Sequence, residues 1–336
     1  MAKTAVVILN WNGEAHLRRF LPSVVANTPS EVEIIVADNG STDGSVAFTE
    51  REFGSVRIIK LGHNFGFAEG YNRALESVDA DYAVLLNSDV ETPAGWIEPL
   101  VACLDAHPDA AVVAPKLLSA EEPEKFEYAG ASGGFIDLLG YPFCRGRILN
   151  ETECDTGQYD DTRKVFWASG AAFCCRLEVF KELGGFAADF FAHMEEIDLC
   201  WRMQLAGYSV MVEPKSRVYH LGGGTLVKNS PGKIFYNHRN NLAMLFRCAS
   251  TGQRIVAALL RPITDFAAAL SYLVEGHPDW AYAVARAYAD FLRWHGRLSD
   301  ERRLIRGSVV AEPDTIYKGS IVLRYLFGCR KFGKLM

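Results

Sequence analysis

The sequence predicts an α/β fold with a doubly wound, mostly parallel sheet and a helical C-terminal extension. Short apolar runs alternate with segments of helical spacing over the first third of the chain, which is the pattern of a sheet covered by helices on both faces. Four of these apolar runs stop at polar clusters. Beyond residue 238 the motifs end, and the chain reads as helical and basic.

The elements follow in order along the chain. Residues 5–9 form a continuous apolar run, as expected for a strand buried on both faces. The next apolar residues recur at helical spacing and predict a helix over residues 14–27 that Pro22 bends. The same alternation predicts strands over residues 32–36, 56–61 and 82–86, with the glycine-punctuated loop 62–70 entering the last intervening helix. Residues 110–238 read as an irregular stretch rich in Gly and aromatic residues.

The polar clusters lie where the predicted strands end. In doubly wound sheets, ligands bind beyond the carboxyl ends of the strands, so four such clusters together favour a binding site. They are Asn10-Trp11-Asn12, Asp38-Asn39, Asn64-Phe65-Gly66 and Asn87-Ser88-Asp89.

Each cluster residue has a structural alternative. Asp89 either holds a divalent cation or caps a helix N-terminus. Asp38 either accepts hydrogen bonds from a ribose or base, or shapes an Asx turn. Trp11 either stacks on a base or belongs to the core.

Three acids stand close together at Glu195, Glu196 and Asp198. Acids in the first turn of a helix suit its dipole, which is the structural explanation. Adjacent carboxylates also repel one another, which raises at least one pKa toward the working range of a general base. Glu195 and Asp198 share a helix face and Glu196 points elsewhere, so the three acids are expected to divide their roles.

Two further residues have alternatives of the same kind. His220 is either structural or a metal ligand, and the glycines at 222–224 suggest a flexible loop near a ligand. Arg239 either clamps a diphosphate or begins a solvated helix.

Charge and cysteine usage narrow the class of protein. The net charge of −6 gives no indication of nucleic-acid binding. Residues 239–336 nevertheless carry 15 Lys/Arg and 8 Asp/Glu, so basic charge is concentrated in the C-terminal region of a chain that is acidic overall. The eight cysteines contain no C-x-x-C pair and read as reduced thiols. No signal peptide is visible, and no run reaches the roughly 18 uninterrupted apolar residues of a spanning helix. These features predict a cytoplasmic catalytic part.

The sequence resembles glycosyltransferase family 2, the inverting transferases of the Rossmann-like GT-A fold, and looks closest to its rhamnosyltransferase-like branch. The ordered motifs span residues 4 to about 245. They are VVILNWNG, IIVADNGSTDGS, NFGFAEGYNRAL, YAVLLNSDVETP, WASGAAFCCRLEVFKELGGF, MEEIDLCWRMQLAGY and VYHLGGGT. The resemblance implies a catalytic domain over 1–238, with a nucleotide-binding half (about 1–115) and an acceptor-binding half (about 116–238), followed by the region 239–336.

The resemblance also implies roles for single residues. The stretch at 87–89 occupies the place of the family's D-x-D motif, so Asp89 would bind Mg²⁺ or Mn²⁺. The first Asp of the motif is Asn87 here, which leaves room for His220 as a further ligand. The donor nucleotide sugar would be held by Leu9, Trp11, Asp38, Asn64, Gly66, Gly70, Asn72, Asn87, Ser88, Asp89 and Arg239. The acceptor would be bordered by Trp167, Ser169 and Gly170.

Glu196 stands where the family has its catalytic base, with Glu195 as the alternative, and Asp198 is either a third catalytic acid or a brace with Arg202. The implied reaction moves a sugar, rhamnose among the candidates, from a dTDP- or UDP-linked donor to a glycan or lipid-linked acceptor in cell-surface polysaccharide synthesis. A rival from another class is a catalytically silent nucleotide-sugar or carbohydrate-binding module. The nucleotidyltransferase loop G-x-G-x-R and the dinucleotide fingerprint G-x-G-x-x-G are both absent after the first strand.

The C-terminal region alternates apolar stripes with Arg and ends in a basic, aromatic tail. One interpretation is a set of interfacial helices on the cytoplasmic face of an anionic membrane, where a lipid-linked acceptor would lie. The other is helices packed on the enzyme's own core or on a second subunit of a homodimer.

Overall fold

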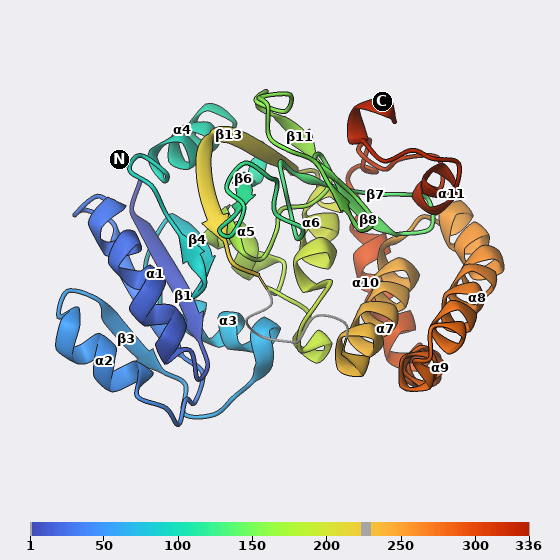
Figure 1. Ribbon diagram of the computed structural model, residues 1–336, viewed down its shortest axis with the longest axis horizontal. Coiled ribbons are helices and arrows are strands. Elements are labelled where there is room, and N and C mark those ends of the chain that lie inside the picture. Colours follow the sequence, from blue (N-terminus) through green and yellow to red (C-terminus); the bar gives the residue numbers. More distant parts are fainter. Residues whose placement is uncertain (1, 223–229, 336) are drawn as a thin grey trace.

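The computed structural model of the protein describes residues 2–222 and 230–335, and a nine-stranded mixed sheet forms its centre (Figure 1). The strand order is β11-β13-β6-β12-β4-β1-β2-β3, with β5 paired to β13. All pairings among β1 to β4 are parallel, as is that of β6 with β13, whereas β12 runs antiparallel to both its neighbours. The strands are β1 (Thr4–Asn10), β2 (Glu33–Asp38), β3 (Arg57–Lys60), β4 (Tyr82–Asn87), β5 (Val90–Glu91), β6 (Ala110–Ser119), β11 (Arg163–Val165), β12 (Ala172–Arg176) and β13 (Ser209–His220).

Helices cover both faces of this sheet, as the doubly wound pattern predicted. Alternate residues of β1 point to opposite faces. Val6 and Ile8 join the core beneath α1, α2 and α4, and Ala5 and Val7 join the core beneath α3, α5 and α6. These helices are α1 (Glu14–Asn27), α2 (Ser45–Glu52), α3 (Gly66–Glu76), α4 (Glu98–Ala106), α5 (Leu177–Glu182) and α6 (Glu195–Leu205).

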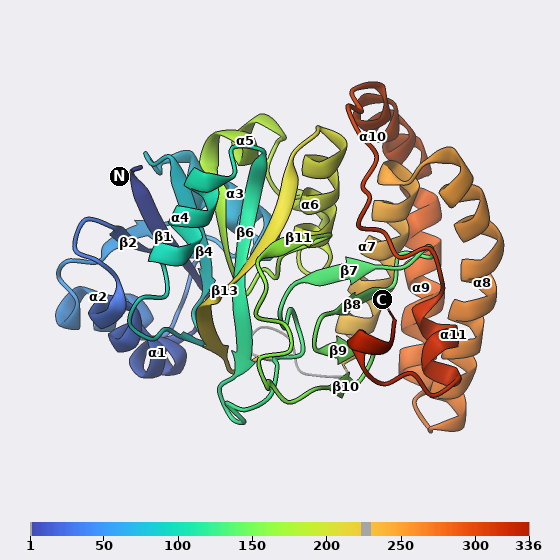
Figure 2. The same cartoon turned by 90° about the horizontal axis from the view of Figure 1, so that it is seen from above.

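A small antiparallel sheet and a helical layer complete the molecule on one side of the main sheet (Figure 2). Within this layer α7 packs against α9 and α10, and α8 packs against α9. The strands are β7 (Gly134–Ile136), β8 (Pro142–Cys144), β9 (Arg147–Ile148) and β10 (Glu151–Thr152). The helices are α7 (Pro231–Cys248), α8 (Thr251–Val274), α9 (Pro278–Arg293), α10 (His295–Gly307) and α11 (Ile321–Leu326), with short 3₁₀ turns at Ala188–Phe190 and Phe332–Lys334.

The structure confirms the predicted fold class and the helix over residues 14–27, and it corrects three details. The predicted boundary between residues 238 and 239 falls inside α7, so the C-terminal region is not a separate unit at that point. The stretch 110–238 contains β6 and β13, which have 10 and 12 residues, and is therefore not irregular throughout. Among the described residues, α8 is long and apolar enough to cross a membrane by length and composition, although Arg254, Arg261 and Asp265 interrupt its apolar run.

Candidate functional site

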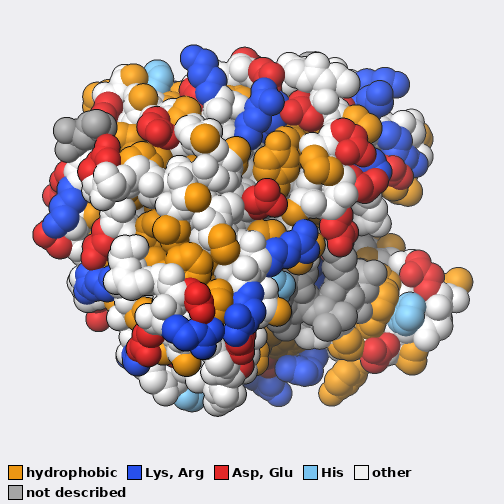
Figure 3. Space-filling model, turned by 60° about the vertical axis from the view of Figure 1, so that its left-hand side comes forward, with side chains coloured by type: hydrophobic (Ala, Val, Ile, Leu, Met, Phe, Trp, Pro, Cys, Tyr) orange, Lys and Arg blue, Asp and Glu red, His pale blue; other side chains and the backbone are white. Residues whose placement is uncertain are grey.

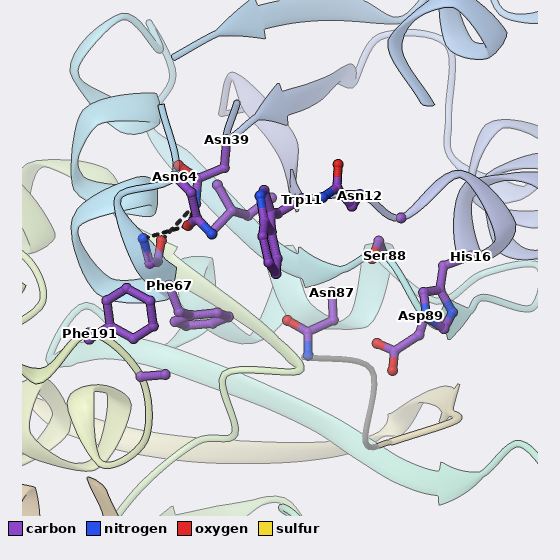
Figure 4. Close-up of a pocket in the computed structure, with 14 residues that line it drawn as sticks. Trp11, Asn12, His16, Asn39, Asn64, Phe67, Asn87, Ser88, Asp89 and Phe191 are labelled. Atoms are coloured by element: carbon purple, nitrogen blue, oxygen red, sulfur yellow. Dashed lines mark hydrogen bonds between the residues drawn. The ribbon is translucent and has the colours of Figure 1, made fainter. Parts of the chain in front are cut away.

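A cleft of about 280 Å³ opens at the carboxyl ends of β1, β2 and β4 (Figure 4). The strand register brings the predicted clusters together, because Asn10 pairs with Asp38 and Leu9 pairs with Asn87. The Trp11 ring projects from the end of β1 into the cleft and is 48% exposed. The lining residues are Leu9, Trp11, Asn12, Gly13, His16, Asn39, Asn64, Gly66, Phe67, Asn87, Ser88, Asp89, Phe191 and Ala192.

Asn39 holds one wall of this cleft in place. Its amide donates to the Gly66 carbonyl (2.9 Å) and accepts from the Phe65 N–H (3.1 Å). Gly66 has φ +78°, and a Cβ there would stand 2.5 Å from the Phe191 ring. Only glycine therefore lets the start of α3 meet the loop before α6. Sequence reading placed Asn39 in a polar cluster and gave it no role of its own.

Three residues predicted to contact the donor support the wall from outside the cleft. The Asp38 carboxylate accepts from the Ser41 N–H at 3.3 Å, which is the Asx-turn alternative. Gly70 faces inward, and a Cβ there would lie 3.1 Å from the Leu9 and Asn39 side chains, so it allows α3 to approach β1. Asn72 exchanges two hydrogen bonds with the backbone of Phe186, at 3.0 and 2.8 Å.

Asp89 lies at the inner end of the cleft, buried against His220. The His220 Nε2 is 3.2 Å from Asp89 Oδ1, and its Nδ1 is 3.3 Å from Glu127 Oε1. Burial lowers the pKa of His220, but the two carboxylates outweigh it and raise this pKa to about 10. Burial raises the pKa of Asp89, and the contact with His220 outweighs that effect and lowers it. Glu127 was missed by sequence reading because it lies 93 positions upstream of His220 in the irregular stretch.

This arrangement bears on the predicted metal ligands. When protonated, the His220 ring is the counter-ion of both Asp89 and Glu127. When its Nε2 is deprotonated, the same ring presents a lone pair beside Asp89 and Asn87, so the role of His220 as a further metal ligand stays a prediction. Among residues 2–222 and 230–335, no group of three or more His, Cys, Asp or Glu side chains is arranged to hold a metal ion. The Asp89 carboxylate and the Asn87 amide supply the hard oxygen donors that Mg²⁺ and Mn²⁺ prefer. They fit a cation whose remaining ligands come from a bound diphosphate. The glycines at 223 and 224 lie outside the described residues.

A second chamber of about 150 Å³ adjoins the cleft and contains the predicted acids. The two spaces share the side chains of Phe67, Asn87, Asp89 and Ala192, so they are continuous past the end of β4. The chamber is further lined by Ala129, Ser169, Gly170, Ala171, His193, Glu195, Glu196, His220 and Lys233.

Glu195 and Glu196 stand at the start of α6, and their buried Oε2 atoms have no hydrogen-bond partner within residues 2–222 and 230–335. Burial raises the pKa of Glu196 to about 7. The pKa of Glu195 is held well above its usual range by burial and by the neighbouring charge of Glu196. The predicted direction of the shift is therefore correct, but desolvation contributes more than repulsion. A carboxylate with a pKa near neutrality and a free oxygen is suited to accept a proton.

Asp198, one turn further along α6, has the opposite surroundings. It accepts from Arg202 Nε at 2.8 Å and from Arg247 Nε at 2.7 Å. Burial raises its pKa, and the two guanidinium groups outweigh burial and lower it. Asp198 does not line the chamber. It is the brace that sequence reading offered as the alternative to a catalytic role.

Two other predicted contacts are wrong. Arg239 donates to the carbonyls of Asp189 (3.0 Å) and Phe190 (3.2 Å), and its guanidinium lies 4.2 Å from the centre of the Trp294 ring. It therefore points to the loop before α6 and not to a diphosphate. Trp167 is 3% exposed and donates to the Phe135 carbonyl at 3.0 Å, so it belongs to the core, whereas its neighbours Ser169 and Gly170 line the chamber.

The loop between Ala188 and α6 is held in an unusual conformation by α7. Phe191, His193 and Met194 have φ values of 64°, 70° and 71°, which cost energy in residues other than glycine. Asn240 in α7 is fully buried and donates to the carbonyls of Phe190, Ala192 and His193 at 3.0, 2.9 and 2.8 Å. Sequence reading missed this support, although two adjacent asparagines in an apolar helix were a visible signal.

Comparison with known proteins agrees with this geometry. The family model described as glycosyl transferase family 2 matches residues 5–184. An N-acetylglucosaminyl-diphospho-decaprenol L-rhamnosyltransferase of Mycobacterium tuberculosis is 27% identical over 258 residues, which is 71% of this chain and 83% of that protein. A pre-mycofactocin glycosyltransferase of the same species is 28% identical over 224 residues, covering 64% of this chain and 42% of that protein.

Solved structures share the fold at lower identity. S. aureus TarS 1–349 in complex with UDP-GlcNAc superposes with a TM-score of 0.57 and 16% identity, covering 91% of this chain and 87% of that one. GalNAc-T7 with UDP, GalNAc and Mn²⁺ superposes with a TM-score of 0.57 and 18% identity, covering 74% of this chain and 48% of that one. The GT-A fold expected from the motifs is confirmed. Because the family model covers more than half of the chain and the site stands where the motifs place it, this rhamnosyltransferase-like protein belongs to glycosyl transferase family 2.

Proposed function

We propose that the protein is a metal-dependent, inverting glycosyltransferase of cell-surface polysaccharide synthesis. It takes a sugar, rhamnose among the candidates, from a dTDP- or UDP-linked donor and transfers it to a hydroxyl of a glycan or lipid-linked acceptor. The observation that carries the proposal is the pair of acids at the start of α6, each with one buried oxygen that has no hydrogen-bond partner among the described residues, in a chamber continuous with the strand-end cleft. The name of the M. tuberculosis relative supports both the rhamnosyl donor and a diphospho-polyprenol acceptor.

The donor occupies the cleft with its base against Trp11 and the wall held by Asn39, and with its diphosphate toward Asp89. His220 keeps Asp89 ionised by pairing with it inside the protein. Asp89 and Asn87 would hold Mg²⁺ or Mn²⁺, and the charge of the bound ion would stabilise the leaving diphosphate.

The acceptor hydroxyl enters the second chamber beside Ser169 and Gly170. Glu196 removes its proton, and the oxygen attacks the anomeric carbon from the side opposite the diphosphate. The bond from that carbon to the diphosphate oxygen breaks, so the nucleoside diphosphate leaves and the configuration inverts. Because Glu196 has a pKa of about 7, it is a strong enough base for this step and is still deprotonated in a useful fraction of molecules near neutral pH.

Thermal melting with dTDP- and UDP-linked sugars, each with Mn²⁺, Mg²⁺ or EDTA, identifies the donor. A donor at a hundred times its dissociation constant stabilises the fold by about 2.7 kcal/mol. The matching donor is then incubated with an N-acetylglucosaminyl-diphospho-polyprenol, and the anomeric configuration of the product is read by NMR. We expect a metal-dependent shift and an inverted linkage.

A retained configuration, or full transfer in EDTA, would contradict the mechanism. Donor binding without transfer to any glycan or lipid-linked acceptor would favour the silent binding module. That rival has one structural feature in its favour, since Asn87 replaces an acid at the metal position.

A further inference from the structure

The outer face of α8 is apolar along its whole length. Side chains spaced three and four residues apart form one stripe, which the helix period places on a single face. Their exposed fractions run from 50% at Leu270 to 83% at Val274. The stripe consists of Ile255, Leu259, Ile263, Phe266, Leu270 and Val274.

The charges of α8 lie on its inner face. Between residues 255 and 274 only Arg261 and Asp265 are charged, and both are almost fully buried. Arg261 Nη2 is 3.1 Å from Asp265 Oδ2, and Asp265 also accepts from the hydroxyls of Tyr141 (2.8 Å) and Tyr288 (2.7 Å). A helix that faces water has the reverse arrangement, with its charges outside. By contrast, the surface in Figure 3 carries acidic and basic side chains intermixed with apolar ones.

A basic tail lies at one end of this face. In both ribbon views α11 is next to an end of α8 (Figures 1 and 2). Its side chains Leu323, Leu326 and Phe327 are 57%, 71% and 86% exposed. From residue 315 onward the sequence has no acidic residue. It has five basic ones, all exposed: Lys318, Arg324, Arg330, Lys331 and Lys334.

We propose that the outer face of α8, together with α11 and the basic tail, docks onto an anionic phospholipid bilayer. The stripe enters the interfacial region, and the tail binds the phosphate headgroups. The helix lies in the plane of the bilayer, because its inner face is fixed to α9 and to the β7–β8 connection by the Asp265 network. The basic, acid-free tail beside the stripe favours an anionic surface as the occupant.

An apolar cavity of about 310 Å³ lies in the same helical layer. Its walls come from α7, α8 and α9, and Ala258, Pro262 and Leu292 at its edge are exposed. Hydrocarbon is the ligand that such walls favour, so the cavity gives room for a lipid chain from the docked bilayer.

Sedimentation of the full-length protein with vesicles tests the proposal, using phosphatidylcholine alone or mixed with phosphatidylglycerol. We expect binding to the mixed vesicles. The double substitution Ile263→Glu/Phe266→Glu should weaken it more than about a hundredfold, because two apolar side chains no longer enter the lipid. Arg330→Gln/Lys331→Gln should weaken it about tenfold or more, and only when phosphatidylglycerol is present.

Leu304→Glu is the matched control, since Leu304 is 74% exposed on α10 and belongs neither to the α8 stripe nor to α11 and the basic tail. It should bind vesicles as the unaltered protein does. Donor-induced thermal stabilisation shows that each variant is folded and keeps its cleft. Absence of vesicle binding by the folded, unaltered protein would overturn the proposal, as would equal binding by the α8 double variant. Light scattering without lipid gives the remaining outcome: a dimer that the α8 variant converts to monomer, with no vesicle binding, would assign the stripe to a second copy.

Discussion

The nucleotide cleft and the adjoining acidic chamber share Asn87 and Asp89, but they hold their carboxylates in different ways. Where the two spaces meet, Asp89 faces His220, and the pKa of Asp89 is lowered. In the chamber, Glu195 and Glu196 have unpartnered oxygens, and their pKa values are raised. Burial is similar in the two regions, so the partner of each acid decides whether it keeps a fixed charge or exchanges a proton.

Removing the base in the chamber should have the largest effect. Glu196→Gln keeps the size of the side chain and removes its basicity, so transfer should fall by about a thousandfold. Donor binding should stay within a factor of about two, because the nucleotide cleft does not include residue 196. Transfer rates and donor titrations on the same preparation measure both quantities.

Glu178→Gln on the exposed side of α5 is the control for the chemical change itself. Glu195→Gln separates the two acids. If that variant loses transfer and Glu196→Gln does not, the base is Glu195.

The second prediction concerns Asp198, the acid of α6 that is paired with two guanidinium groups. Asp198→Asn leaves Arg202 and Arg247 without their buried counter-charge, and it should lower the free energy of unfolding by about 3–5 kcal/mol. Denaturant unfolding measures the loss. At temperatures where the variant is folded, its transfer rate should be close to normal. A large loss of transfer with normal stability would make Asp198 a catalytic acid after all.

The pH dependence of the free energy of unfolding tests the raised pKa of Glu196 without any substitution in the cleft. The pKa of Glu196 is raised from 4.5 to about 7, so folding favours its protonated form. The stability that this group contributes is present below pH 4.5 and is lost as pH rises through about 7, a change of about 3 kcal/mol. Unfolding at several pH values should therefore show the difference between Glu196→Gln and the unaltered protein growing in favour of the variant as pH rises. A difference that does not vary with pH would mean that Glu196 is not desolvated.

Much of the cleft could be predicted from sequence because its parts are local. Each polar cluster follows its own strand directly, and parallel strands bring their ends to one edge, so Trp11, Asn64 and Asp89 needed no long-range information. The chamber depends on contacts between distant segments. The motif found Glu196, but its charge state depends on burial beneath other elements. Arg239 and Trp167 were misassigned because aromatic and backbone partners far away in sequence hold their polar groups.

Asn240 offers the smallest expected effect and tests whether the chamber depends on the C-terminal helices. Asn240→Ala removes the side-chain donor to the Ala192 and His193 carbonyls and one of several donors to the Phe190 carbonyl, which should cost about 1–3 kcal/mol of stability. The strained loop can then relax and shift Glu196, so kcat should fall about tenfold with little change in the KM for the donor.

Asn241→Ala is the matched control: Asn241 is also buried, but its amide donates to the Gly140 carbonyl at 2.7 Å and reaches the loop only at the Met194 sulfur, at 3.8 Å. That variant should lose stability and keep its kcat. Equal losses of kcat in the two variants would mean that α7 acts on the chamber only through general stability, and that the strained loop before α6 is positioned by other contacts.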